Sequence, residues 1–523
     1  MDELSPTTDE IGWRGLMIDH GIGSLPRRRA RITPAAIALI QNDVSLTYAE
    51  LAQRVDAVAA VLAGLGVLAG DRVAYLGPND LATFEVLFAT ARIGAIFVPL
   101  NTRLAAEEIR YQLDDCVPAV LVLDPRVESL GVNALASAAV CPMLLRLDDA
   151  YEATAACQAS HPSDAGYMAD VTMQDPALIM YTSGTSGRAK GAVLTHGNIT
   201  WNILTQLAHI SMGTDDAVLC AAPLFHVLGL CQLTLPALYT GGKVVVMDSF
   251  HAAEFLAAIS RHRATAFPLA STMLAMLRDH PDWDAADLSG VRFVVFGGSP
   301  VAGPVVQAWL DRQVEVLQGY GMTEASPGVL MAAPGGVREH TTSAGVPHYF
   351  TDVALLTADG KIVHGPGQGE LLVKGPNIFS GYWRKPEATA ATFVDGWYRS
   401  GDVVRVDEDG WAYVLDRLNA VIISGGENVY PAEVERVIGE LDAVAECAVV
   451  PVQDRRWGEV AAAFVVLRPG QELDELTILR HLQSKLARYK IPKYVVFRTT
   501  LPRNATGKIQ RLVLRDEARK LSA

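Results

Sequence analysis

Cysteine is scarce in this sequence, and the cysteines that occur lie far apart. Only six of the 523 residues are cysteine, and no pair has the C-x-x-C spacing of metal or redox sites. They are Cys116, Cys141, Cys157, Cys220, Cys231 and Cys447. A disulfide-rich miniature protein is excluded, and a reduced, cytoplasmic setting is expected. The first residues are acidic and lack a basic segment followed by an apolar one, so no secretory signal is expected.

The sequence also lacks an excess of basic residues. Lys and Arg total 44 against 58 Asp and Glu, which gives a formal net charge of −14. Because nucleic-acid binding needs a basic face that neutralises phosphates, the composition argues against nucleic acid as a partner. Hydrophobic residues make up 50% and charged residues 20%, the balance of a globular protein rather than a disordered one.

Charge is absent altogether from residues 217–242. This stretch is long enough to cross a bilayer, for which about 20 apolar residues are needed. Pro223, His226 and Pro236 interrupt it, and prolines and polar groups facing lipid would leave hydrogen-bonding groups unsatisfied. We therefore expect buried core elements near a site here, and no transmembrane segment.

A short basic cluster, Arg27-Arg28-Arg29-Ala30-Arg31, lies near the N-terminus. Such a cluster can attract anionic lipid or the 3′-phosphate of a nucleotide cofactor. No stripe of lipid-inserting residues adjoins it, so a solvated face is favoured, and only weak peripheral membrane contact stays open. The sequence also leaves a homodimer open.

Short apolar runs alternate with helical patterns over most of the chain, which predicts an α/β architecture with parallel sheets. Between about residues 360 and 413, Gly and Pro become dense and short alternating runs predict an antiparallel, β-barrel-like subdomain or meander. Strands are expected at residues 73–76, 95–100, 177–180, 218–220, 243–246 and 291–295, and helices at 48–65 and 252–260.

A domain boundary is expected after residue 417. Residues 1–419 carry 28 basic against 45 acidic side chains, whereas residues 420–523 carry 16 against 13. We expect a large N-terminal domain of stacked α/β sheets at residues 1–417 and a small α+β domain at 418–523. The small domain is predicted to contain helices at 432–441 and 476–486 and strands at 445–451 and 461–467.

The most distinctive local sequence is Tyr181-Thr-Ser-Gly-Thr-Ser-Gly-Arg-Ala-Lys-Gly191. Its glycines permit close backbone approach, and its hydroxyls and Lys190 supply donors and positive charge, which suits an oligophosphate. It is not a Walker A loop, because Lys190 follows Gly187 by three positions instead of one. The alternative is a flexible surface linker, which is disfavoured because a buried apolar run precedes the loop.

This loop and five other segments, in order and spacing, resemble the AMP-forming adenylate superfamily of acyl-CoA synthetases, adenylation domains and luciferases. The resemblance covers about residues 30 to 515 and is nearest to bacterial fatty-acyl and aryl-CoA ligases. It implies that the large domain binds ATP and the acyl group and that the small domain is mobile. The other segments are Ala222-Pro-Leu-Phe-His226, Gln318-Gly-Tyr-Gly-Met-Thr-Glu324, Tyr398-Arg-Ser-Gly-Asp402, the stretch from Asp416 to Pro431, and Leu501-Pro-Arg-Asn-Ala-Thr-Gly-Lys508.

The resemblance implies a nucleotide-binding role for each matching residue. Thr323 would contact the α-phosphate and Glu324 would hold Mg²⁺. The β,γ-phosphates would be held by Thr182, Ser183, Gly184, Thr185, Ser186, Gly187 and Lys190. Tyr320 would stack on adenine beside Gly298 and Ser299, and Asp402 and Arg417 would hold the ribose, Arg417 alternatively a phosphate.

Chemistry independent of the resemblance supports these assignments, although each residue has a simpler alternative. A carboxylate suits vicinal hydroxyls or a hard cation, and an aromatic face suits a purine. Taken alone, Asp402 could be a turn residue, Glu324 a charge at a helix N-terminus, and Tyr320 part of the core.

Lys508 is the implied catalytic residue. Bringing a carboxylate to the α-phosphate places like charges together, and one ammonium between them could contribute about 4 kcal/mol per contact at an effective dielectric constant of 20. The alternative is an exposed lysine in a basic tail. His226 would line the acyl pocket and shift between half-reactions, although a histidine in apolar surroundings is more often a core residue.

The resemblance places a hinge at Asn419, about which the small domain would rotate. Rotation would withdraw Lys508 and bring Gly425 and Gly426 to line a pantetheine tunnel. The family commonly has Asp or Lys at the hinge, but Asn tolerates positive φ, so a backbone swing at Asn419 is still expected. Ala189 replaces the usual proline of the phosphate loop, which costs only loop rigidity.

The pocket residues expected around the acyl group are small or apolar, namely Val227, Leu228, Gly229, Gly297, Gly321, Pro327 and Val329. An apolar monocarboxylic acid therefore fits better than a substrate with a second charge. The expected activity is an ATP-dependent carboxylate–CoA ligase that uses ATP, Mg²⁺ and CoA to form acyl-AMP and then acyl-CoA from a fatty or aryl acid. The alternatives are transfer to a carrier-protein thiol or a nitrogen nucleophile, a luciferase-like oxygenase, and a catalytically silent binding protein.

Overall fold

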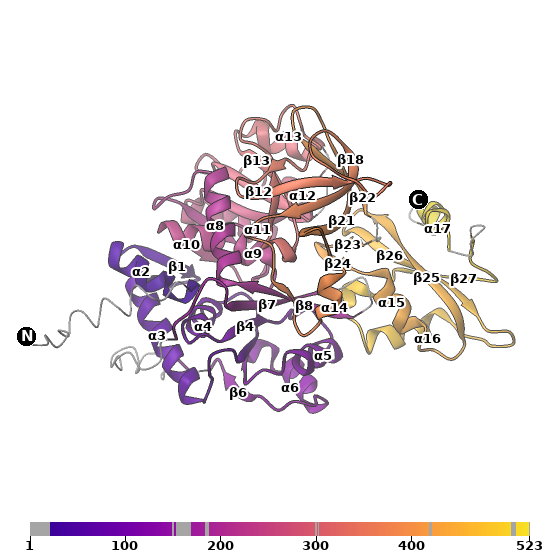
Figure 1. Cartoon of the computed structure of the whole chain (residues 1–523), viewed down its shortest axis with the longest axis horizontal. Coiled ribbons are helices and arrows are strands. Elements are labelled where there is room, and N and C mark those ends of the chain that lie inside the picture. Colours follow the sequence, from indigo (N-terminus) through magenta and orange to yellow (C-terminus); the bar gives the residue numbers. More distant parts are fainter. Residues whose placement is uncertain are drawn as a thin grey trace, which may run out of the picture.

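The computed structural model describes residues 21–148, 151–152, 169–183, 188–298, 301, 303–417, 421–503 and 509–521, without the side chains of residues 183, 416, 417 and 432. Three sheets build the large part of the molecule, and a fourth lies in the small C-terminal part, which is yellow in Figure 1. The mixed α/β fold with a large N-terminal and a small C-terminal domain confirms the predicted fold class.

The first sheet has seven strands and carries the segment that leads into the phosphate loop. Strands β7, β4, β3, β5 and β6 run parallel, and β8 pairs antiparallel with β7. In spatial order the strands are β19 (Gly381–Tyr382), β8 (Ala189–Thr195), β7 (Pro176–Ser183), β4 (Ile96–Pro99), β3 (Arg72–Leu76), β5 (Val120–Leu123) and β6 (Met143–Arg146).

The second sheet has nine strands, and its central strands are parallel. Their apolar runs are buried on both faces, as expected of a parallel sheet covered by helices. In order they are β15 (Val346–Pro347), β14 (Gly328–Met331), β13 (Glu315–Gly321), β12 (Phe293–Gly297), β11 (Ala266–Ala270), β9 (Ala217–Cys220), β10 (Lys243–Val246), β1 (Ile37–Gln41) and β2 (Val44–Thr47).

The helices of the large part pack around these two sheets (Figure 1). Helix α3 (Tyr48–Gly64) begins at a capping box, in which Thr47 and Glu50 satisfy each other's backbone N–H groups. Helix α4 (Leu81–Arg92) is buried at all of its residues. The others are α2 (Leu25–Ile32), α5 (Ala106–Cys116), α6 (Glu128–Ala136), α8 (His196–His209), α9 (Val227–Cys231), α10 (Thr234–Thr240), α11 (Ala252–His262), α12 (Ser271–Arg278), α13 (Gly303–Asp311) and α14 (Pro386–Ala390).

The third and fourth sheets differ from the first two in being mainly antiparallel. The third contains β17 (Ile362–Val363), β16 (Asp352–Leu356), β18 (Gly367–Lys374), β21 (Trp397–Val406), β20 (Phe393–Val394) and β22 (Ala412–Arg417), all antiparallel. The fourth contains β24 (Glu427–Val429), β23 (Ile422–Ser424), β26 (Gly458–Leu467), β25 (Val444–Asp454) and β27 (Tyr494–Arg498), covered by α15 (Pro431–Ile438), α16 (Glu475–Gln483) and α17 (Arg511–Ala518).

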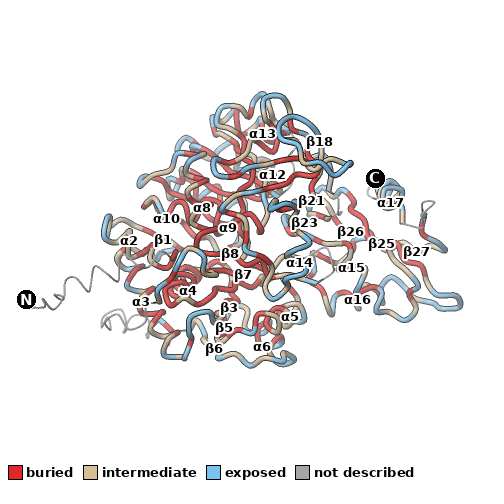
Figure 2. The backbone as a smooth tube through the Cα atoms, in the orientation of Figure 1, coloured by how far each residue is buried: buried red, intermediate tan, exposed pale blue. Residues whose placement is uncertain are grey.

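The uncharged stretch 217–242 forms β9, α9 and α10, and most of it is buried, as predicted for core elements. In the described part of the chain, no helix is long and apolar enough to cross a membrane. Figure 2 shows the distribution of burial over the fold, with buried segments in the sheets and exposed segments in the outer loops.

The basic cluster of helix α2 makes contacts within the protein. Arg27 pairs with Asp56 at 2.7 Å, and Arg29 donates to the carbonyl oxygen of Thr240 at 2.6 Å. These contacts favour a structural role for the cluster over lipid binding.

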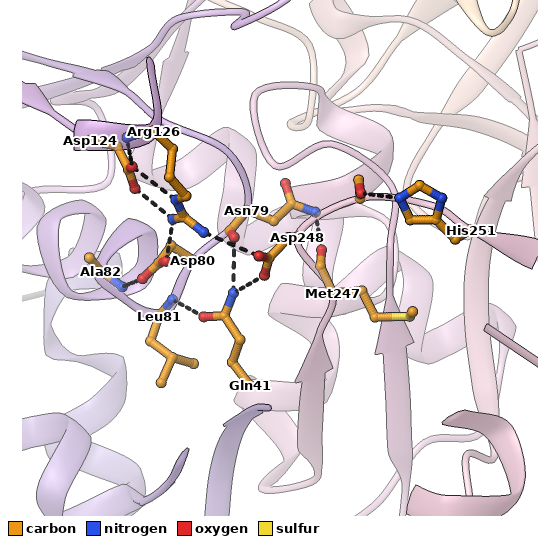
Figure 3. Close-up of polar contacts among 11 residues, drawn as sticks. Gln41, Asn79, Asp80, Leu81, Ala82, Asp124, Arg126, Met247, Asp248 and His251 are labelled. Carbon is orange, nitrogen blue, oxygen red and sulfur yellow. Dashed lines mark hydrogen bonds and ion pairs between the residues drawn. The ribbon is translucent and has the colours of Figure 1, made fainter. Parts of the chain in front are cut away.

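A buried polar network joins the first two sheets (Figure 3). Gln41 Nε2 donates to the Asn79 carbonyl and to Asp248. The side chain of Asn79 in turn donates to the carbonyl of Ala222 and accepts from the N–H of Leu224. The network therefore fixes the backbone of the segment that ends at His226.

Candidate active site

A cavity of about 750 Å³ lies where the large and small parts of the protein meet. Its walls include residues of the first three sheets, together with the turn between β23 and β24 and residues of α15. Most of the described residues that the sequence singled out line this cavity. They are Thr182, Lys190, His226, Gly298, Tyr320, Thr323, Glu324, Asp402, Gly425 and Gly426.

Tyr320 and Asp402 meet on one wall of the cavity. Tyr320 is the penultimate residue of strand β13, and its hydroxyl donates to Asp402 Oδ2 at 2.6 Å. Asp402 is buried in β21 and pairs in register with Arg417 of β22. An aromatic ring beside a buried carboxylate can hold a purine nucleoside, with the ring on the base and the carboxylate on hydroxyl donors.

Glu324 occupies a second wall with Lys190 and Tyr382. The Tyr382 hydroxyl donates to Glu324 Oε1 at 2.7 Å, and Lys190 Nζ lies 5.0 Å from the centroid of the Tyr382 ring. Burial raises the pKa of Glu324 above its usual value, although Tyr382 and Lys190 oppose this effect. Thr182 and Thr323 line the cavity beside this group.

The surroundings of Glu324 suit a hard divalent cation bound together with phosphate. The described residues contain no cluster of three or more His, Cys, Asp or Glu that could hold a metal unaided. Mg²⁺ is usually bound by one or two carboxylates together with substrate phosphates and water. A buried carboxylate whose charged form is disfavoured fits that chemistry, because a bound cation would stabilise its ionised state.

Several predicted site residues lie outside the described residues. They are Gly184, Thr185, Ser186, Gly187, Ser299, Asn419 and Lys508. For Ser183 and Arg417 the backbone is described and the side chain is not. Their roles stay predictions.

The acyl-pocket prediction was partly wrong. Val227, Leu228, Gly297, Gly321 and Pro327 line the cavity, as predicted. Val329 does not, because side chains alternate along β14 and Gly328 and Leu330 occupy the face toward the cavity. Gly229 instead packs against backbone, and a Cβ there would lie 2.2 Å from the Pro223 carbonyl oxygen.

The small part contributes a wall made by the turn Gly425-Gly426-Glu427. Both glycines have positive φ, +59° and +86°. A Cβ on Gly426 would lie 3.2 Å from Cβ of Ala270 in the large part, so the turn approaches that wall closely. Only glycine allows this backbone conformation and this approach together.

Glu427 ties the two parts together at the cavity. Its carboxylate contacts His226 Nε2 at 2.9 Å and Arg103 Nη1 at 2.7 Å, both from the large part. Burial alone would raise the pKa of Glu427, but His226 and Arg103 outweigh it and lower the pKa to about 2. The carboxylate is therefore ionised and its charge is matched across the interface.

A second tie lies beside the first. Lys490 is buried between Glu108 of α5, at 2.5 Å, and Glu433 of α15, at 2.9 Å. Glu108 also accepts from the N–H of Ala487 at 2.6 Å. Burial opposes the charge of Lys490, but the two carboxylates raise its pKa above the usual value.

The sequence reasoning did not single out Arg103, Tyr382 or Glu427 as site residues. Glu427 directly follows the predicted Gly425 and Gly426, so its motif position was a usable signal. Arg103 and Tyr382 stand in segments without a recognised pattern, and only the folded chain brings them to the cavity.

Residues 26–383 match the AMP-binding enzyme family, and residues 433–508 match the AMP-binding enzyme C-terminal domain. The expected boundary at residue 417 falls between these matches and stays a prediction. Feruloyl-CoA synthase from Amycolatopsis sp is 46% identical over 493 residues, which cover 94% of this chain and 98% of that protein.

Solved structures resemble this chain over 94% of its length. An o-succinylbenzoate CoA synthetase from Bacillus subtilis, bound with the product analogue OSB-NCoA, has a TM-score of 0.85 at 31% identity and covers 94% of this chain and 98% of its own. The same synthetase in complex with the acyl-adenylate OSB-AMP covers the same shares but has a TM-score of 0.69 at 32% identity. An amide bond synthetase from Marinactinospora thermotolerans has a TM-score of 0.83 at 30% identity and covers 94% and 99%. The chain belongs to the AMP-binding enzyme family.

Proposed function

We propose that this protein is an ATP-dependent carboxylate–CoA ligase that forms an acyl-AMP and then an acyl-CoA. The main observation that supports this proposal is the shared cavity. Tyr320, Asp402 and Glu324 of the large part line it together with the Gly425-Gly426 turn of the small part. The first set suits a nucleotide, and the glycine turn leaves room for a slender thiol-bearing chain. The similarity to CoA ligases over nearly the whole chain supports the same activity.

In the first step, the substrate carboxylate attacks the α-phosphate of ATP, and pyrophosphate leaves. Thr182 and Lys190 hold the departing phosphates, and Thr323 contacts the α-phosphate. Glu324 would hold Mg²⁺, which when bound offsets the charge that develops on the phosphates. Lys508 sits between carboxylate and phosphate and lowers their repulsion.

In the second step, the thiol of CoA attacks the acyl-AMP carbonyl, the thioester forms and AMP leaves. The present domain arrangement suits this step, because Glu427 contacts His226 and Gly426 approaches Ala270. The higher TM-score with the relative bound to a CoA product analogue than with its adenylate complex supports this assignment. Rotation about Asn419 then exchanges this arrangement for the one that brings Lys508 to the α-phosphate.

The substrate is an apolar monocarboxylic acid, with an aryl acid favoured over a fatty acid. Small and apolar residues line the acyl side of the cavity, including Gly297, Gly321 and Leu228. A relative that is 46% identical over 94% of this chain is named feruloyl-CoA synthase, and its feruloyl group is an aryl acyl group, which supports the preference for an aryl acid.

A nitrogen nucleophile is the second candidate acceptor, because the similar structures include an amide bond synthetase.

Product analysis separates the thiol of CoA from a nitrogen nucleophile as the acceptor. Purified protein is given ATP, Mg²⁺ and a panel of aryl and aliphatic acids, with CoA, with an amine, or with neither. We expect pyrophosphate from acid and ATP, and a CoA thioester only when CoA is added. Amide formation without thioester would overturn the CoA assignment, and oxygen uptake would indicate the oxygenase.

Lys508→Ala tests the proposed chemistry directly. We expect pyrophosphate release to fall at least about 100-fold, while conversion of supplied acyl-AMP and CoA to thioester is largely kept, because the lysine acts only in the first step. Lys520→Ala, which removes another lysine of the basic C-terminal segment, is the matched control. Retention of adenylation at the wild-type rate in Lys508→Ala would contradict the role of Lys508.

A further inference from the structure

Helix α5 holds the strand that leads into the phosphate loop. The Tyr181 hydroxyl, on β7, donates to Asp115 Oδ2 at 2.8 Å and lies 3.2 Å from the carbonyl oxygen of Gln112. Asp115 also accepts from Lys385 Nζ at 2.6 Å. Two residues of one helix turn therefore fix the strand at the point where it enters the loop.

The same helix holds the strand that leaves the loop. Tyr111 lies one turn before Asp115, on the same face of α5. Its hydroxyl donates to the carbonyl oxygen of Ala189 at 3.2 Å. Ala189 is the first residue of β8 and pairs in register with Ser183, the last residue of β7. The hydrogen bond therefore acts on the backbone pair that lies nearest the loop.

The ring of Tyr111 has a second contact, with the residue before Ala189. The guanidinium carbon of Arg188 lies 5.7 Å from the centroid of the Tyr111 ring. Lys190 has a similar arrangement, because its Nζ lies 5.0 Å from the centroid of the Tyr382 ring. Both cationic side chains line the cavity. An aromatic face attracts a cation without neutralising it, so both charges stay available to an anion.

The sequence of the loop itself does little to fix residues 188–190. Gly184, Gly187 and Gly191 have more conformational freedom to lose than other residues. Ala189 does not fix φ, as a proline would. A segment that must be ordered when its ligand binds costs conformational entropy at that moment, which lowers the affinity for the ligand. A contact from outside the loop that orders residues 188–190 reduces this cost.

We propose that Tyr111 is a positioning residue for the first half-reaction. Its hydroxyl fixes the backbone at Ala189, and its ring directs Arg188 toward the terminal phosphates of ATP, which leave as pyrophosphate. The proposal rests on the proposed function and adds a residue of α5 to it. The same cations hold these phosphates before and during the reaction, so loss of the Tyr111 contacts should raise the KM for ATP more than it lowers kcat.

Tyr111→Phe tests the hydroxyl, because the variant keeps the ring beneath Arg188. In pyrophosphate release with the best acid of the panel, we expect the KM for ATP to rise about fivefold and kcat to change less than about twofold, as for the loss of one neutral hydrogen bond. Thioester formation from supplied acyl-AMP should stay unchanged, because that step involves no pyrophosphate. Tyr239→Phe, at an exposed tyrosine of α10 outside the cavity, should keep the wild-type KM.

Tyr111→Leu tests the ring. Arg188 loses its aromatic partner in this variant, so we expect the KM for ATP to rise about a further threefold above that of Tyr111→Phe. An equal KM in the two variants would show that the ring does not direct Arg188.

Ala189→Pro separates loop positioning from a general structural role. Proline is tolerated at the first residue of a strand, and its carbonyl can still accept a hydrogen bond. Because it fixes φ at this position, it should lower the KM for ATP of Tyr111→Phe at least about twofold and that of the wild type by a smaller factor. The Tm of Tyr111→Phe should stay within about 2 °C of that of the wild type, since the packed ring is kept.

The outcomes separate this proposal from the proposed function. An unchanged KM for ATP in Tyr111→Phe would overturn the role of Tyr111, as would equal slowing of both half-reactions or a proline effect of the same size in both backgrounds. In each of these cases the ligase proposal stands, provided that the wild type forms pyrophosphate and a CoA thioester. If the wild type releases no pyrophosphate with any acid, both proposals are wrong.

Discussion

Two buried carboxylates line the same cavity from different parts of the protein, and their surroundings are opposite. Glu427 of the small part lies between Arg103 and His226, and its pKa is lowered to about 2. Glu324 of the large part accepts a hydrogen bond from the Tyr382 hydroxyl at 2.7 Å, and burial raises its pKa. The cationic groups around Glu427 outweigh its burial, whereas Tyr382 and Lys190 only partly offset the burial of Glu324. This contrast agrees with the proposal that Glu427 serves the contact between the two parts and that Glu324 serves a bound cation.

The largest effect should come from removing the charge of Glu324. Glu324→Gln can still accept from Tyr382 but cannot offset a cation, so adenylation should fall by about 100-fold or more, about 3 kcal/mol. Pyrophosphate release measured against Mg²⁺ concentration should also show a higher Mg²⁺ requirement. Tyr382→Phe, which removes only the hydroxyl, should cost less than about tenfold. An unchanged rate and an unchanged Mg²⁺ midpoint in Glu324→Gln would show that Glu324 does not hold the cation.

Acid should weaken the large part before it weakens the tie made by Glu427. Burial lowers the pKa of His196 to about 4, and its Nδ1 accepts from the N–H of Ile22. Because the unfolded chain binds this proton below about pH 6.5 and the folded chain does not, stability is lost as pH falls from 6.5 toward 4. The loss at pH 5 is about 2 kcal/mol for one such histidine.

Thermal unfolding between pH 7 and pH 5 checks this expectation. His196→Asn keeps an acceptor for Ile22 but cannot titrate, so its Tm should fall less over this range than that of the wild type. The Glu427 tie should be unaffected there, because a lowered carboxylate pKa gives stability that is lost only below about pH 4.5, toward pH 2. Equal pH dependence of the two proteins would show that His196 does not control it.

Glu427→Gln should act on one half-reaction. The variant loses the ionised carboxylate that contacts Arg103 and His226 of the large part, so thioester formation from supplied acyl-AMP should slow about tenfold, near 1.4 kcal/mol. Adenylation should change less than about twofold. Glu475→Gln, at an exposed position of the small part, is the matched control. Equal slowing of both half-reactions would show that Glu427 stabilises the fold as a whole and has no specific role in the contact between the two parts.

Glu108→Gln should give the smallest effect, about threefold on the same half-reaction. Lys490 keeps Glu433 as a partner in the variant, so only part of the tie is lost. Rapid-quench measurement of thioester formation from supplied acyl-AMP can resolve this change. Glu107→Gln, on the same turn of α5, serves as the control for that helix. An effect larger than that of Glu427→Gln would reverse the ranking of the two ties.

Local sequence patterns predicted many of the helices and strands, because capping residues and the spacing of apolar residues determine them. The helix expected at residues 48–65 is α3, fixed by the Thr47 capping box, and the strand expected at 73–76 is β3. Strand limits differ by one or two residues, as at residues 291–295, observed as Phe293–Gly297, because pairing with β11 begins at Phe293 and continues to Gly297. Motif positions singled out Tyr320, Glu324 and Asp402, which line one cavity, and their nucleotide-binding roles stay predictions.

Contacts between the domains could not be predicted from local pattern. Glu427 and His226 are separated by 201 positions, and Lys490 and Glu108 by 382. Their meeting depends on how one folded unit rests on another, which no periodicity encodes. The error at Val329 has a similar origin: alternation along a strand defines two faces, but only the packed sheet decides which face borders the cavity.

The carboxylate of Glu108 has consequences for how the joint separates. Its Oε2 accepts from the N–H of Ala105 at the start of α5 as well as from the small part, and Glu433 likewise stays beside Lys490. If the two surfaces separate as proposed, each retains a polar partner of its own, so neither exposes a stranded ion. The contact would then be broken and remade at low energetic cost, as the proposed two-step mechanism requires.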